Sequence, residues 1–129
     1  MAINYKLIKK EYRFQHPQKT LDMIKEYIDE RTEFLKSDEI KTYSISFINL
    51  IKLEQKYQIY LYNGDLRNLL KTMQKRLLFS VDNMLEMSED VQLGKVTEND
   101  YLEFCDLCKE EYELVKERAK LEYAEYLKK

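Results

Sequence analysis

Glycine and proline are unusually scarce in this chain, with two glycines and one proline among 129 residues. An all-β domain needs turn residues about every 8–12 positions. A loop that cradles phosphate needs several glycines close together. The shortage therefore excludes most all-β folds and the common nucleotide-binding loops, and it indicates long helices joined by short turns.

The spacing of apolar residues agrees with this expectation. Apolar side chains recur at intervals near 3.6 residues, the period of an α-helix. The pattern predicts a short helix or an ordered arm over residues 3–14. It predicts further helices from Pro17 to about Leu35, from about Glu39 to Tyr62, from Leu66 to Ser88 or Asp90, and from Thr97 onward. We therefore predict an all-α fold over residues 1–129, a single compact bundle of about four to five mostly antiparallel helices with a long C-terminal helix.

Polar residues and glycine mark the expected helix ends. Ser37 and Asp38 can each cap a helix N-terminus. In Asn63-Gly64-Asp65, the glycine can end one helix in the left-handed conformation and the aspartate can cap the next. Residues 90–97 are predicted to form the longest loop, after which Thr97 and Asp100 resemble a capping box.

Composition narrows the classes of function. The net charge is −2 and the sequence pI is near 5.6, which argues against direct nucleic-acid binding. No stretch approaches the ~20 apolar residues of a membrane span, and no signal peptide is recognisable at the N-terminus. We therefore expect a cytoplasmic protein that does not engage a membrane.

Cys105-Asp106-Leu107-Cys108 is the segment that most resembles a chemical site. A structural zinc site needs four ligands, but the chain has two cysteines and one histidine, His16. Both cysteines fall on the apolar stripe of the last helix, where a free cysteine packs as a small hydrophobic residue. No nucleophile–base pairing can be assembled. We therefore predict no metal, no cofactor and no catalysis.

Charge is distributed unevenly along the chain. Residues 86–113 hold ten acidic side chains against Lys95 and Lys109, a balance of −8, whereas residues 1–19 have a balance of +4. An acidic surface with aromatic anchors suits a basic protein partner and fast, steered association. The predicted partner-binding residues are Glu86, Glu89, Asp90, Glu98, Asp100, Tyr101, Glu103, Phe104, Asp106 and Glu110.

One arrangement resembles a known family. A helix bearing Ile24, Tyr27, Ile28 and Phe34 leads to a wide apolar helix that ends in Tyr60-Leu61-Tyr62-Asn63-Gly64-Asp65-Leu66, before a helix with Leu69 and Leu70. The segment from about Leu21 to Met87 in this respect resembles the N-terminal helical domain of PoNi-type immunity proteins, which neutralise toxins in bacterial polymorphic-toxin systems. Members of that family typically continue into a second helical domain, so no individual binding residue is carried over.

The resemblance implies an immunity protein whose cognate toxin is a nuclease. We therefore expect an immunity or inhibitor protein that binds and occludes a basic toxin domain through its acidic surface, without catalysis. One alternative is an acidic inhibitor encoded by a phage or mobile element, which would mimic DNA and block a nucleic-acid enzyme. Another is a structural homodimer formed through the last helix, with Tyr112, Val115 and Ala119 at the interface.

Overall fold

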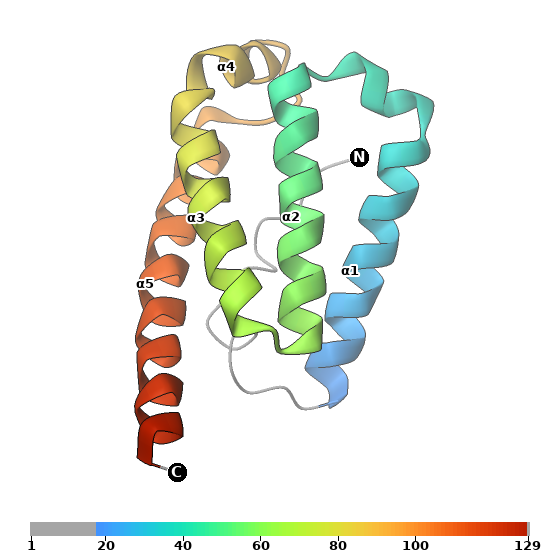
Figure 1. The fold of residues 1–129 in the computed structure, drawn as a ribbon. Coiled ribbons are helices and arrows are strands. Elements are labelled where there is room, and N and C mark those ends of the chain that lie inside the picture. The colour runs from blue at the N-terminus through green and yellow to red at the C-terminus, as the bar shows by residue number, and fades with distance from the viewer. Residues whose placement is uncertain (1–17, 129) are drawn as a thin grey trace.

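The computed structural model describes residues 18–128, so the predicted helix over 3–14, the helix start at Pro17 and His16 lie outside the described part. All regular structure over residues 18–128 is helical (Figure 1), which confirms the predicted fold class and the long last helix. The elements are α1 (Gln18–Lys36), the 3₁₀ helix η3 (Asp38–Thr42), α2 (Ile45–Asn63), α3 (Leu66–Asp82), α4 (Met84–Gln92) and α5 (Glu98–Lys128).

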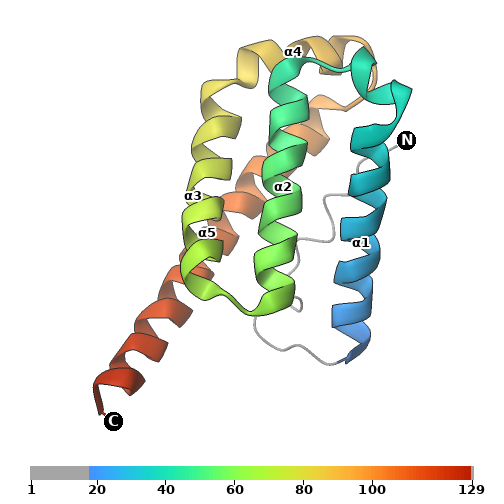
Figure 2. The same ribbon diagram turned by 45° about the vertical axis from the view of Figure 1, so that its right-hand side comes forward.

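The four long helices form an antiparallel array in the order α1, α2, α3, α5. The most extensive helix contacts join α1 to α2, α2 to α3 and α3 to α5, so α1 and α5 form the two sides of the array (Figure 1). The short α4 crosses one end and carries the chain from α3 to α5. Figure 2 shows that the C-terminal part of α5 projects beyond the opposite end of the other helices.

Local signals in the sequence fix several helix ends as predicted. Gly64 has φ = 70°, the left-handed conformation that ends α2. The side chain of Asp65 accepts a hydrogen bond from the Asn68 N–H and caps α3. The Thr97 hydroxyl accepts one from the Asp100 N–H at 3.1 Å, at the start of α5.

Three predicted boundaries are wrong. The third predicted helix was expected to start at Glu39, but α2 begins at Ile45, after a 3₁₀ turn and an N-cap formed by Ser44. The fourth predicted helix divides at Asn83 into α3 and α4. Because α4 continues to Gln92, the connection to α5 is shorter than the predicted loop over 90–97.

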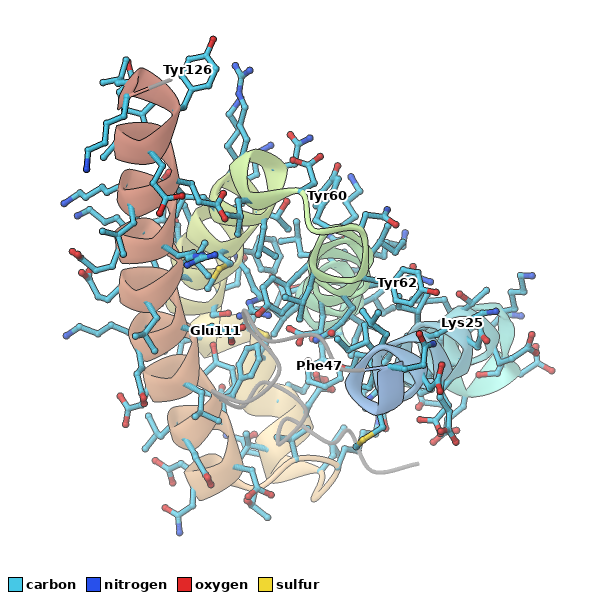
Figure 3. All side chains as sticks on the ribbon, turned by 90° about the horizontal axis from the view of Figure 1, so that it is seen from below. Lys25, Phe47, Tyr60, Tyr62, Glu111 and Tyr126 are labelled. Carbon is cyan, nitrogen blue, oxygen red and sulfur yellow. The ribbon has the colours of Figure 1, made fainter. Side chains whose placement is uncertain are left out.

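Two apolar clusters form the core. The first lies toward the end that α4 crosses and contains Phe34, Phe47, Leu50, Ile51, Met87, Val96, Tyr101, Phe104 and Cys108. The second lies toward the α2–α3 turn and contains Ile24, Tyr57, Leu61, Leu69, Met73 and Val115. Figure 3 shows Phe47 pointing into the interior between the helices.

A layer of buried charged residues lies between the two clusters. Each long helix contributes one side chain at the matching level: Arg31, Glu54, Arg76 and Glu111. Arg76 Nη1 donates a hydrogen bond to Glu54 Oε2 at 3.0 Å, and Arg76 Nη2 lies 3.5 Å from Glu111 Oε2. In Figure 3 the Glu111 side chain points from α5 toward the interior. The layer thus joins α2, α3 and α5 through one guanidinium.

Two aromatic rings cover the arginines of this layer. The Arg76 guanidinium lies 4.1 Å from the centroid of the Tyr57 ring, and that of Arg31 lies 4.4 Å from the Tyr27 ring. Burial would lower the pKa of Arg76, but the carboxylate of Glu54 raises it above its ordinary value. The pKa of Tyr27 is also raised, first by burial and then by Glu54. Arg76 therefore stays charged and Tyr27 neutral.

None of the helices over residues 18–128 combines the length and the apolar composition that a membrane crossing requires.

Candidate protein interface

The structure separates the ten predicted partner-binding residues into two groups. Seven of them are exposed and remain candidates: Glu86, Glu89, Glu98, Asp100, Glu103, Asp106 and Glu110. The prediction is wrong for the other three, because Asp90 and Phe104 are each 1% exposed and Tyr101 is 5% exposed.

The two aromatic residues belong to the core, so they cannot serve as anchors for a partner. Phe104 and Tyr101 both pack in the first apolar cluster, on the side of α5 that faces α3. The Tyr101 hydroxyl donates a hydrogen bond to the carbonyl of Ser80 on α3. Its pKa is raised by burial and, secondarily, by Cys105, so the phenol stays protonated.

Asp90 is used within the fold. Its carboxylate accepts hydrogen bonds from the Ser44 hydroxyl at 2.9 Å and the Ser44 N–H at 3.3 Å. Glu86 accepts another from the Ser46 N–H at 3.3 Å, although its side chain is otherwise exposed. Both carboxylates therefore lie at the N-terminus of α2, where the helix dipole favours negative charge. They hold α4 against α2.

The remaining carboxylates on α5 form a continuous row. Glu103, Asp106, Glu110 and Glu113 are exposed and follow one another at intervals of three, four and three residues. This spacing places them along one side of the helix. We call this row the acidic stripe.

A groove lies between α4 and the first turns of α5, near the N-terminal end of the acidic stripe. It encloses about 280 Å³ and is lined by Met84, Leu85, Ser88, Val91, Gln92, Glu98, Tyr101 and Leu102. We call it the α4 groove. Its α4 wall is the side of the helix opposite to Met87 and Asp90, which are buried against the rest of the bundle.

The walls of the α4 groove leave large apolar side chains in solvent. Leu85 is 88% exposed, the highest value among the large apolar residues of the described chain, and Leu102 is 44% exposed. Leu85 and Leu102 are therefore accessible for apolar contact with another molecule.

Sequence reasoning missed the groove because it continued one helix through Asn83. In that continuous helix Val81, Met84 and Leu85 belong to the buried stripe, but in the structure all three are exposed. The break changes the direction of the chain, so that Met87 becomes the buried apolar residue of α4. The buried charged residues were not predicted either. A signal for one of them is present in the sequence, because Glu54 lies three residues after Ile51 and three before Tyr57 and so falls on the apolar stripe of α2.

A second acidic surface lies on α1, away from the residues predicted to bind. An open hollow of about 1060 Å³ is bordered by Asp22, Lys25, Glu26, Asp29, Glu30, Glu33, Phe34, Ser37 and Glu39. Six of these residues are acidic and one is basic. Phe34, its one apolar residue, is only 1% exposed, so this hollow offers charge without an apolar contact.

The two cysteines have the packing role that the sequence predicts. Cys108 is fully buried in the first apolar cluster, and Cys105 is half-buried beside it. Burial raises the pKa of both thiols, that of Cys108 to about 12. No group of metal-binding side chains that could hold an ion occurs over residues 18–128.

We expect the Cys108 thiol to be almost inert in the folded chain. In a Cys105→Ser variant, reaction with Ellman's reagent at pH 8 should be at least about 100-fold slower folded than unfolded, because only the thiolate reacts. Because the folded pKa is raised, the stability due to Cys108 is fully present below about pH 8.5 and decreases as pH rises toward 12. Rapid reaction without unfolding would mean that Cys108 is accessible.

The dimer interface considered from the sequence requires correction. Val115 is fully buried in the second apolar cluster, and Tyr112 packs beside it. Val115 cannot be an interface residue without unpacking the core, whereas Tyr112 and Ala119 are only partly buried. The last section of α5, residues 121–128, is exposed at every position and carries Leu121, Tyr123, Tyr126 and Leu127. Figure 3 shows Tyr126 at this end, away from the other helices.

Comparison of the chain with protein-family models, with curated proteins and with solved structures gave no match.

Proposed function

We propose that this chain is an immunity or inhibitor protein that binds a basic toxin domain, in particular a nuclease, and occludes it without catalysis. The observation that supports this best is the pairing of an exposed apolar groove between α4 and α5 with a row of carboxylates on α5. Protein interfaces that bind tightly combine a desolvated apolar centre with a polar rim.

Charge explains why a nuclease fits this surface. Nuclease sites carry positive charge because they hold phosphates, so a carboxylate-rich surface can cover them. The acidic stripe contributes four exposed carboxylates, and Lys109 is the basic residue closest to them in sequence. In this proposal the chain acts in the cytoplasm, where the nucleic acid that needs protection is found.

The surface on α4 and α5 is favoured over the hollow on α1 by its apolar content. Charges guide association and exclude wrong partners, but apolar anchors supply much of the affinity. Leu85 and Leu102 provide such anchors beside the acidic stripe, whereas the hollow on α1 exposes no comparable side chain.

A DNA mimic is the second candidate, and it relies on the same carboxylates. Its partner would be a nucleic-acid enzyme rather than a toxin. The apolar groove favours the first proposal, because mimicry of phosphates requires no exposed leucines.

The function can be tested by protection from the toxin. An immunity gene directly follows its toxin gene, so the product of the gene preceding this one should arrest growth when expressed alone. Co-expression of this chain should restore growth and yield a complex. Growth arrest that persists despite soluble expression of this chain would contradict the proposal, and capture of a DNA-binding enzyme instead would favour the mimic.

We expect reversal of charge in the acidic stripe to weaken this protection. The variant Glu103→Lys, Asp106→Lys, Glu110→Lys should lower the association rate with the captured toxin about tenfold or more at low salt, and make it less dependent on salt. A matched control is Asp22→Lys, Glu26→Lys, Asp29→Lys, which makes the same change of net charge on α1. Equal effects of the two variants would indicate general attraction rather than this surface.

A further inference from the structure

We propose that the α4 groove receives one apolar side chain of the partner, from a short segment with lysine or arginine on both sides. This inference rests on the proposed function, because it specifies which part of a basic protein the binding surface recognises.

The size of the groove limits its occupant. Pockets for small-molecule ligands measure about 300–1,000 Å³, whereas a cavity of about 150 Å³ already holds a benzene-sized group. At about 280 Å³, the α4 groove matches one leucine, methionine or phenylalanine side chain with part of its backbone.

The walls supply the apolar contact that such a side chain needs. Leu85 comes from α4 and Leu102 from α5, so the occupant would touch both helices. Met84 and Val91 complete the α4 side. The groove floor is fixed because the Tyr101 hydroxyl bonds to the Ser80 carbonyl, and because Asp90 ties α4 to α2. A preformed site avoids part of the ordering cost of binding.

Carboxylates border the groove on both helices. Glu89 follows Leu85 by four residues on α4, and Asp106 follows Leu102 by four residues on α5, so each lies one turn from an apolar wall residue. Glu98 belongs to the wall itself, and the groove lining includes no lysine or arginine. A segment that places an apolar residue in the groove would therefore bring its flanking residues next to negative charge on both sides.

The flanking charges also distinguish a protein segment from other occupants. A free apolar molecule would use the walls but gain nothing from Glu89 and Asp106. A purely basic segment would use the carboxylates but leave Leu85 and Leu102 in solvent. An amphipathic segment with one apolar anchor and basic neighbours uses both, in the manner of a peptide that lies in a groove between helices.

The test is a selection of displayed random peptides on the immobilised chain. We expect enrichment of peptides that carry Leu, Met or Phe with Lys or Arg within about one turn on either side. A synthetic peptide from the selection should bind at least about 20-fold more weakly to Leu85→Asp and to Leu102→Asp, as for a hot-spot residue. Leu121→Asp is the matched control, an exposed leucine on the far part of α5, and should bind unchanged.

The outcomes separate this inference from the proposed function. Enrichment of peptides without basic residues, no enrichment at all, or equal binding by Leu85→Asp and the parent chain would overturn the groove assignment. If the Leu85→Asp variant still protects from the toxin, the proposed function stands, but the groove is not the binding site. If basic peptides bind in the groove but the chain does not protect from the toxin, the groove is a binding site and the toxin is not the partner.

Discussion

Replacing Arg76 with alanine is expected to lower the free energy of unfolding by about 3–5 kcal/mol. The Arg76 side chain is fully buried, and its guanidinium lies between Glu54 and Glu111, which are 3% and 1% exposed. Without it, two carboxylates from different helices remain in the interior without their shared cation. Because small domains are stable by about 5–15 kcal/mol, the variant should be close to unfolding. Urea denaturation followed by circular dichroism measures the change.

Two further variants separate the loss of the cation from the loss of packing. The triple variant Glu54→Leu, Arg76→Met, Glu111→Leu removes the buried charges together and should recover most of the stability, because apolar side chains of similar size can replace a buried ionic group. Arg118→Ala removes a half-exposed arginine paired with Glu122 and should change stability by less than about 1 kcal/mol. A small effect of Arg76→Ala, comparable to that of Arg118→Ala, would show that the layer is hydrated.

Phe104→Ala should cause a loss of similar size, about 3–5 kcal/mol, through the cavity that it leaves. Phe104 is 1% exposed and packs in the first apolar cluster, and its ring also lies 5.7 Å from the Arg76 guanidinium. The measurement is again the free energy of unfolding. If Phe104 were instead an exposed anchor, as predicted from the sequence, the substitution would weaken binding to the partner and leave the free energy of unfolding unchanged.

Leu102→Ala is the matched control for Phe104→Ala, because it lies two residues earlier on the outward side of α5. It should change stability by no more than about 0.5 kcal/mol, as is typical of exposed sites. If Leu102→Ala destabilised the chain more than Phe104→Ala, the orientation of α5 described above would be wrong.

The parts of the fold that follow from sequence are those set by local rules. The left-handed glycine at position 64 and the cap at Asp65 are contained in three consecutive residues, so the α2–α3 junction is predictable. The long last helix is predictable for a similar reason. Its apolar residues keep helical spacing across many turns without glycine or proline.

The break between α3 and α4 depends on residues far away in sequence. Asn83 is acceptable within a helix, and nothing local requires one to end there. In the structure its side-chain amide donates to the Phe79 carbonyl, while its carbonyl oxygen accepts from the Ser46 hydroxyl at 3.1 Å. Ser46 lies 37 positions earlier, so the break is a tertiary effect, and the α4 groove that depends on it could not be predicted from the sequence.

The candidate site was predictable in its charge and not in its apolar part. The acidic excess between residues 86 and 113 is visible in the sequence, and most of its members are exposed. Tyr101 fits both the buried stripe of α5 and an acidic surface with aromatic anchors. Composition cannot decide between these roles, because the decision depends on which side of α5 meets α3.

The two-sided construction of α4 has a consequence for how this protein can change over generations. Met87 and Asp90 are buried and attach the helix to the bundle, while Leu85, Ser88 and Gln92 line the α4 groove. In the proposed function, substitutions at these positions alter what the chain binds without disturbing the residues that keep it folded. In the proposed function, recognition and folding therefore depend on different residues of this helix of nine residues, and a few replacements can adapt the chain to a changed toxin without loss of the fold.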